Sequence, residues 1–208
     1  MRTDHGVTKL GVRFERALIF ANRKHAGQPR KRTRVPYISH LLSVVGLVLE
    51  AGGDEDLAIA ALLHDVVEDC GGEPMLKEVR RRFGPRVARM VDGCTDAYVT
   101  PKPPWQQRKE GYLKRLRGND DDTRLVSAAD KLHNARSILL DYRESGESIW
   151  ERFQGKREGT LWYYRALVKE FDRKRSNRLT KELKRVVDEL EVVTASTVSS
   201  KKHAGKKK

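Results

Sequence analysis

Apolar residues recur every three to four positions along most of the chain. The spacing is clear over residues 10–21 and again over residues 41–49. This period places apolar side chains along one face of an α-helix, whereas alternation of the kind found in β-strands is nearly absent. The pattern therefore predicts an all-α fold.

Glycine, proline and short polar runs divide this pattern into segments of helical length. They gather at 27–36, 52–53, 71–72, 84–85, 100–104 and 118–121. Asp54 and Asp120 precede two of the segments, and an aspartate there accepts the free N–H groups of a first helical turn. We expect one helix to contain LAIAALLHDVVED (57–69) and another to contain TRLVSAADKLHNARSILL (123–140).

The length of 208 residues predicts one domain. We expect it to span residues 10–191, after a flexible N-terminus at residues 1–9. Small polar residues and then lysines fill residues 192–208, and five of the last eight residues are lysine. Such a segment has little to bury, so a disordered, Lys-rich C-terminal tail is expected.

The chain is strongly basic. Lys and Arg number 43 and Asp and Glu number 29, for a formal net charge of +14. This balance favours anionic partners, either nucleic acid or phosphorylated small molecules. No run reaches the roughly 18 apolar residues of a membrane span, and the N-terminus lacks the apolar core of a secretory signal. We therefore expect a cytoplasmic protein with no membrane partner, in which Cys70 and Cys94 are reduced.

The string LLHDVVEDC concentrates four ionisable residues in an apolar segment: His64, Asp65, Glu68 and Asp69. On one continuous helix, the spacing of four would stack His64 over Glu68 and Asp65 over Asp69. Buried carboxylates without partners are costly, whereas a divalent cation would offset their charge and accept an imidazole nitrogen. The string therefore suggests a metal site.

Two further candidate ligands interrupt other apolar helices, His40 in PYISHLLSVV and Asp130 in LVSAADKLHNA. With His64 and Asp65 they make a mixed nitrogen and oxygen set, suited to Mn²⁺, Fe²⁺, Co²⁺ or a similar divalent ion. Taken singly, His40 could be a hydrogen-bonded core histidine, and Asp130 could pair with a neighbouring cation. His25 and His133 are expected to be structural partners and not ligands.

These segments together resemble the HD-domain metal-dependent phosphohydrolases, specifically the hydrolase domain of the RelA/SpoT family and the small stand-alone alarmone hydrolases. The resemblance is carried by residues 24–42, 62–70 and 128–139, with weaker support from 161–171. It implies an HD-type helical bundle. It also implies a Mn²⁺ ion held by His40, His64, Asp65 and Asp130, and a catalytic pair formed by Glu68 and Asp69.

The resemblance also implies a set of substrate contacts. Five cations lie within the eleven residues from Lys24 to Arg34, just before His40, which suits a phosphorylated nucleotide. The expected substrate-binding residues are Lys24, Arg30, Lys31, Tyr37, Lys131, Asn134 and Arg136. The loop after Lys31 is one residue longer than in the long bifunctional members of the family, which leaves the substrate more open than the type of reaction.

The function expected from this resemblance is hydrolysis of the 3′-diphosphate of guanosine tetra- or pentaphosphate, to GDP or GTP and pyrophosphate. Only the basic tail follows residue 191, so no synthetase activity is expected. One alternative is the same chemistry on another phosphorylated nucleotide, such as the 2′-phosphate of NADPH. A second is a nucleic-acid-binding protein with a vestigial HD site; otherwise nucleic acid is expected to contact the basic tail only. The sequence leaves the oligomeric state open.

Overall fold

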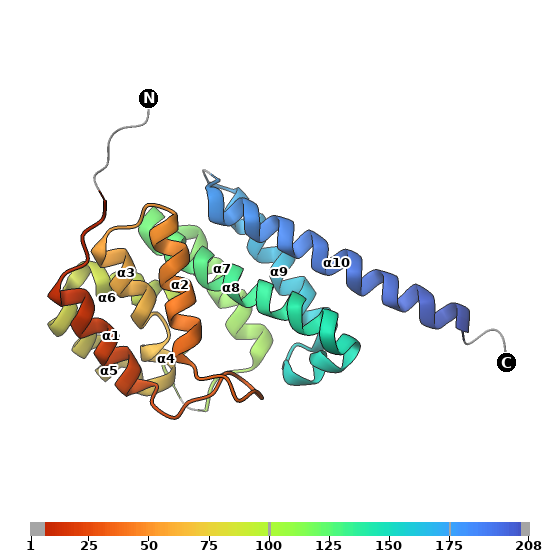
Figure 1. Cartoon of the computed structure of the whole chain (residues 1–208), viewed down its shortest axis with the longest axis horizontal. Helices are drawn as coiled ribbons and strands as arrows, with labels where there is room; N and C mark the ends of the chain where they lie inside the picture. Colours follow the sequence, from red (N-terminus) through yellow and green to blue (C-terminus); the bar gives the residue numbers. More distant parts are fainter. Residues whose placement is uncertain (1–6, 100, 175, 205–208) are drawn as a thin grey trace.

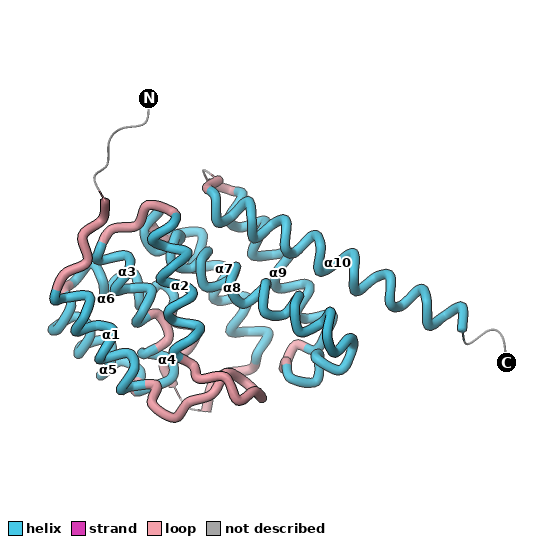
Figure 2. Tube along the Cα trace, viewed as in Figure 1, coloured by secondary structure: helices cyan, strands magenta, loops and turns pink. Residues whose placement is uncertain are grey.

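The computed structural model describes residues 7–99, 101–174 and 176–204. This part of the chain contains helices, turns and loops, with no strand beyond an isolated bridge between Pro29 and Pro36 (Figure 2), so the all-α prediction is confirmed. The helices are α1 (Val12–Lys24), α2 (Ile38–Glu50), α3 (Glu55–Leu63), α4 (Val66–Cys70), α5 (Gly72–Phe83), α6 (Pro85–Cys94), α7 (Trp105–Gly118), α8 (Asp121–Ser145), the 3₁₀ helix η1 (Gly146–Arg152), α9 (Lys156–Asp172) and α10 (Arg178–Ala204).

Helix α3 is the centre of the N-terminal half of the bundle. Every residue from Leu57 to Leu63 is buried, and α1, α2, α6 and α8 pack around the helix. A helix that is apolar on all sides is stable only inside such a shell. The predicted cap is present, because Asp54 accepts a hydrogen bond from the Leu57 N–H at 3.0 Å.

The single helix expected over residues 57–69 is broken in the structure. Helix α3 ends at Leu63, His64 and Asp65 form a turn, and α4 begins at Val66. The Nδ1 atom of His64 bonds the Ala61 carbonyl at 2.8 Å, and Asp65 stands as the N-cap residue of α4. The predicted stacking of His64 over Glu68 is therefore wrong, because these two residues belong to different helical segments.

Helix α8 connects the two halves of the molecule (Figure 1). It packs against α2, α3 and α6 on one side and against η1, α9 and α10 on the other. Asp120 caps this helix by accepting from the Thr123 N–H at 2.8 Å, as the sequence predicts. Asp130 lies in its middle and is buried. Since α8 crosses the core, a single polar residue on it can face side chains from α2 and α3.

The described part of the chain extends beyond the domain bounds of 10–191 expected from the sequence. Thr8 donates to the Gly53 carbonyl at 3.1 Å, whereas residues 1–6 lie outside the described part. At the other end α10 runs on to Ala204, past the expected boundary at 191, and residues 205–208 lie outside the described part. Val193 packs against the core and Thr194 is buried, so the packed face of α10 continues at least to residue 194. No described helix is both long enough and apolar enough to span a bilayer.

Candidate active site

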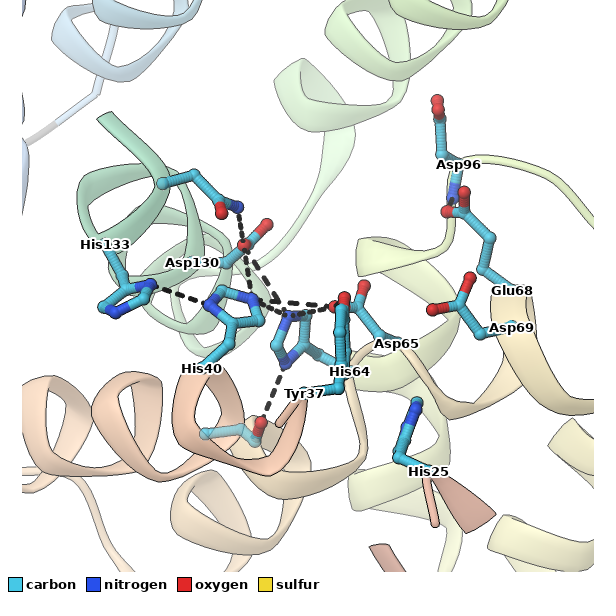
Figure 3. A network of polar contacts seen from close by, with 12 residues as sticks. His25, Tyr37, His40, His64, Asp65, Glu68, Asp69, Asp96, Asp130 and His133 are labelled. Carbon is cyan, nitrogen blue, oxygen red and sulfur yellow. Dashed lines mark hydrogen bonds and ion pairs between the residues drawn. The ribbon is translucent and has the colours of Figure 1, made fainter. Parts of the chain in front are cut away.

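Four side chains from three parts of the fold converge on one point (Figure 3). His40 comes from α2, His64 and Asp65 come from the turn between α3 and α4, and Asp130 comes from α8. The Nε2 atom of His64 lies 3.0 Å from Asp65 Oδ2 and 3.6 Å from Asp130 Oδ1. The Nε2 atom of His40 lies 3.6 Å and 3.3 Å from the same two oxygens. The helix break makes this possible, because it lets adjacent residues His64 and Asp65 face one point.

The hydrogen bonds of the two imidazole rings make this point a site for a cation. His64 Nδ1 lies 2.8 Å from the Ala61 carbonyl oxygen, which can only accept, so Nδ1 carries a proton and Nε2 is left to bind a proton or a metal ion. His40 Nδ1 lies 2.8 Å from Nδ1 of His133, which leaves its own Nε2 facing that of His64. The candidate ligand atoms of His40, His64 and Asp65 all lie within 4.8 Å of one another. Imidazole nitrogens and carboxylates are the ligands of divalent transition metals, so the residues fit such an ion.

The electrostatics of the cluster agree with this geometry. Burial disfavours a charged His64, but the carboxylates of Asp65 and Asp130 outweigh it and raise the pKa of the imidazole well above its usual value. Burial likewise opposes charge on Asp65, but His64 and His40 outweigh it and hold the pKa of that carboxyl well below its usual range. The cluster therefore attracts positive charge, and protons compete there with a metal ion.

Neighbouring groups hold the two carboxylates in place. Tyr37 donates to Asp65 Oδ2 at 2.5 Å, Asn134 donates to Asp130 Oδ1 at 2.6 Å, and Lys131 donates to Asp130 Oδ2 at 2.6 Å. The pairing of Asp130 with a neighbouring cation, considered from the sequence as an alternative to metal binding, is thus present together with the cluster. Lys131 bonds Oδ2 of Asp130, and Oδ1 of Asp130 faces the two imidazoles. Such outer contacts orient the ligands of metal sites.

Glu68 and Asp69 lie on α4, beyond Asp65 as seen from the imidazoles (Figure 3). Glu68 Oε1 accepts from Lys102 at 2.7 Å, and Oε2 accepts from the backbone N–H of Asp96 at 3.1 Å. Asp69 Oδ2 accepts from the side-chain amide of Gln28 at 2.9 Å. Both carboxylates therefore have fixed positions beside the cluster.

A cavity of about 620 Å³ opens next to these groups. Seven cationic side chains line it: Arg30, Lys31, Lys102, Arg108, Lys109, Lys131 and Arg152. Glu68 and Asp141 are the carboxylates among the lining residues, so positive charge dominates the wall. Aromatic side chains complete the wall, from Tyr37, Trp105, Phe153, Tyr163 and Tyr164. A cavity of this composition suits an anionic ligand with a planar group.

Comparison with known proteins identifies the family. Residues 17–161 match the HD domain family. The chain belongs to the HD-domain family. Its relatives include the human guanosine-3′,5′-bis(diphosphate) 3′-pyrophosphohydrolase MESH1, 38% identical over 122 residues, which are 57% of this chain and 65% of the human protein. The protein of the same name from Xenopus tropicalis is 37% identical over 140 residues, which are 65% of this chain and 75% of that protein.

The HD domain also matches part of a longer protein and two solved structures. A guanosine-3′,5′-bis(diphosphate) 3′-pyrophosphohydrolase from Aquifex aeolicus is 34% identical over 65% of this chain and 19% of its own length. A structure described as a metazoan orthologue of SpoT that hydrolyses ppGpp matches with a TM-score of 0.72 and 29% identity, over 88% of this chain and 97% of that one. The structure of lmo0812 from Listeria monocytogenes matches with a TM-score of 0.65 and 26% identity, over 73% and 97%.

The HD domain brings most of the sequence-predicted site residues together. The four expected ligands converge, Glu68 and Asp69 lie beside them, and five expected substrate contacts line the cavity: Arg30, Lys31, Tyr37, Lys131 and Asn134. Lys24 and Arg136 are not among the lining residues. Their side chains pair with Glu78 at 3.5 Å and Glu182 at 3.0 Å.

The two histidines expected to be structural partners, His25 and His133, have different positions. His25 contacts Gln28 in its own loop at 2.8 Å, as expected of a structural partner. His133 bonds His40 and also lines the cavity, so it lies closer to the site than the sequence suggests. Burial and the neighbouring His40 lower the pKa of His133 to about 4.

The sequence does not predict the contacts of four residues at the site: Gln28, Asp96, Lys102 and Arg108. Gln28 stands in the basic string KHAGQPRKR, whose cations indicate phosphate binding and give no sign of a contact between Gln28 and Asp69. Lys102 lies in a proline-rich stretch that predicts only a loop, and no local pattern shows that this loop returns to α4.

Proposed function

We propose that this HD domain hydrolyses the 3′-diphosphate of guanosine tetra- and pentaphosphate, with Mn²⁺ as its metal, to GDP or GTP and pyrophosphate. The observation that carries the proposal is the juxtaposition of the four-residue cluster, the Glu68–Asp69 pair and a cavity lined by seven cations. Relatives whose names state this activity support it.

The metal cluster and the carboxylate pair have separate tasks in this proposal. His40, His64, Asp65 and Asp130 would hold the ion, which would supply a water of lowered pKa and polarise the phosphoryl group. Glu68 and Asp69 orient that water, and one of them accepts its proton as the water oxygen bonds to phosphorus. The leaving ribose 3′-oxygen takes a proton from the carboxylate pair as its bond to phosphorus breaks. Two neighbouring carboxylates can divide these roles, one as base and the other as acid.

The cavity cations bind the phosphates in this proposal. Among the described residues, no carboxylate pairs with Arg30 or Lys31, and both side chains line the cavity. Arg30 donates to Asn134 at 2.9 Å, and Asn134 in turn donates to Asp130. This chain of contacts ties a phosphate-binding guanidinium to a proposed metal ligand. A guanidinium fixed in this way binds phosphate oxygens with defined geometry.

A substrate comparison tests the proposal. The metal-free protein is supplied with Mn²⁺ and with guanosine 3′,5′-bis(diphosphate), and released pyrophosphate is measured. A parallel sample receives NADPH, and released phosphate is measured. We expect pyrophosphate release that depends on Mn²⁺ and exceeds any release from NADPH. Preferred turnover of NADPH would reassign the substrate. Binding of RNA without turnover of either compound would overturn the proposal.

A further inference from the structure

We propose that Asp96 is a positioning residue for Glu68, acting through its own backbone N–H while α7 holds its side chain. The inference rests on the proposed function in one respect, which is that Glu68 is a catalytic carboxylate. It adds a component of the site that the metal ligands and the cavity do not include.

The first part of the argument is the contact itself. Both oxygens of Glu68 are bonded by the segment 95–104, through the Asp96 N–H at 3.1 Å and the Lys102 ammonium at 2.7 Å. The Lys102 ammonium is on a flexible side chain and also lies 3.6 Å from Asp69 Oδ1, so it can pair with either carboxylate. The N–H is part of the backbone and points at one oxygen of Glu68 only. The position of the Asp96 backbone therefore sets the position of that oxygen.

The second part is how this backbone is held in a loop. The Asp96 side chain is 7% exposed and points away from Glu68 (Figure 3). Its Oδ2 accepts from Arg108 and, at 2.8 Å, from Lys109, both near the start of α7. Arg108 also donates to the Pro103 carbonyl at 3.1 Å. One carboxylate thus fastens the loop that carries the N–H to a rigid helix, and such support fixes catalytic geometry.

The third part is charge. Burial opposes ionisation of Asp96, but Lys109 and Arg108 outweigh it and hold the pKa of this carboxyl below its usual value. Lys109 is itself partly buried, lines the cavity and interacts electrostatically with Glu68 as well as with Asp96. When Asp96 carries no negative charge, Glu68 is the carboxylate that attracts the Lys109 ammonium. Loss of the charge therefore frees the loop and also draws Glu68 away from its position.

The test uses Asp96→Asn, which keeps the size of the side chain and removes its charge. We expect kcat to fall on the order of ten- to hundredfold, as a small misplacement of a catalytic group does, with KM changed less than threefold. Glu68→Gln combined with Asp96→Asn should lose no more activity than Glu68→Gln alone, because Asp96 acts through Glu68. Asp92→Asn is the matched control, since Asp92 accepts from Tyr98 in the same region and has no contact with Glu68. That variant should retain its kcat within twofold.

A second measurement is independent of turnover and of the stability of the Asp96 variant. The amide proton resonance of residue 96 is recorded by NMR in the native chain and in Glu68→Gln. We expect a clear upfield shift in the variant, because the charged acceptor is lost. An unchanged resonance, or activity losses that multiply in the double variant, would overturn the positioning role. If the native chain has no hydrolase activity but the expected amide shift is observed, the proposed function is overturned. The contact between the Asp96 N–H and Glu68 then remains established.

Discussion

The Nε2 atoms of His40 and His64 face each other at 3.3 Å. The Nδ1 of His64 bonds a backbone carbonyl and that of His40 bonds another imidazole. The carboxylates of Asp65 and Asp130 approach the same point. Lone pairs that converge in this way repel unless a proton or a metal ion lies between them. The centre of this HD domain is therefore built around a positive charge supplied from outside the chain.

Mutations should separate the role of the proposed metal ligands from that of the proposed catalytic pair. We expect Asp65→Ala to lose bound metal and activity together. Glu68→Ala should keep the metal and lose about 10²- to 10⁴-fold in kcat, the usual contribution of a positioned acid or base. Elemental analysis and pyrophosphate release on the same samples measure the two effects. Asp188→Ala, an exposed change on α10, is the control. Full activity in Glu68→Ala would show that the catalytic pair is misassigned.

Gln28 should support turnover by holding the Asp69 carboxylate in position. Its amide nitrogen donates to Asp69 Oδ2 at 2.9 Å, while its oxygen contacts His25 at 2.8 Å, so the side chain is held from both ends. We expect Gln28→Leu to lower kcat on the order of tenfold with metal content unchanged, because Asp69 loses a fixed donor. Gln107→Leu, at an exposed position on α7, should behave like the native chain. Equal kcat for both variants contradicts the role given to Gln28.

The cavity cations should affect substrate binding more than turnover. Phosphate contacts made equally in the ground and transition states change KM and leave kcat almost unchanged. Arg30→Ala and Lys31→Ala are expected to raise KM roughly ten- to hundredfold, the range for a charged hydrogen bond. Lys24→Ala and Arg136→Ala provide matched controls, because these cations pair with carboxylates away from the cavity. Steady-state kinetics that rank the four variants in another order would place the phosphates elsewhere.

The sequence predicts the parts of the site that depend on local pattern. The helical period, the two aspartate caps and the polar residues within apolar helices identify the fold and the four converging side chains. The break after Leu63 is not predicted, because LAIAALLHDVVED has no glycine or proline at His64 and Asp65. His64 and Asp65 contact side chains from α2 and α8, and no local pattern contains these contacts.

The sequence is also silent on partners far apart in the chain. Lys24 and Lys31 look equivalent in a basic string, yet the direction of α1 turns Lys24 toward Glu78 and leaves Lys31 in the cavity. The approach of Asp96 and Lys102 to Glu68 depends on how α7 is docked. Such relationships follow from packing and cannot be derived from composition or spacing.

The cap of α3 should make a measurable, pH-dependent contribution to stability. Partial burial opposes charge on Asp54, but the Leu57 N–H and Arg86 outweigh it and lower the pKa of the carboxyl. Its contribution is therefore complete above the unfolded pKa, near 4, and is lost as the pH falls through the lower folded value. We expect Asp54→Ala to reduce the free energy of unfolding by about 1 kcal/mol at pH 7. In urea unfolding the difference from the native chain should shrink at pH 3; a constant difference contradicts this account.

The most direct test of the central claim is a metal titration followed by pyrophosphate release. The chain is stripped of metal, Mn²⁺ is added in steps, and release from guanosine 3′,5′-bis(diphosphate) is measured beside Asp65→Ala. The account predicts no release without metal, activity that saturates as one ion binds per chain, and no activity in Asp65→Ala at the same concentrations. Release that is independent of metal, or a native chain that binds the ion at this site and releases nothing, would contradict it.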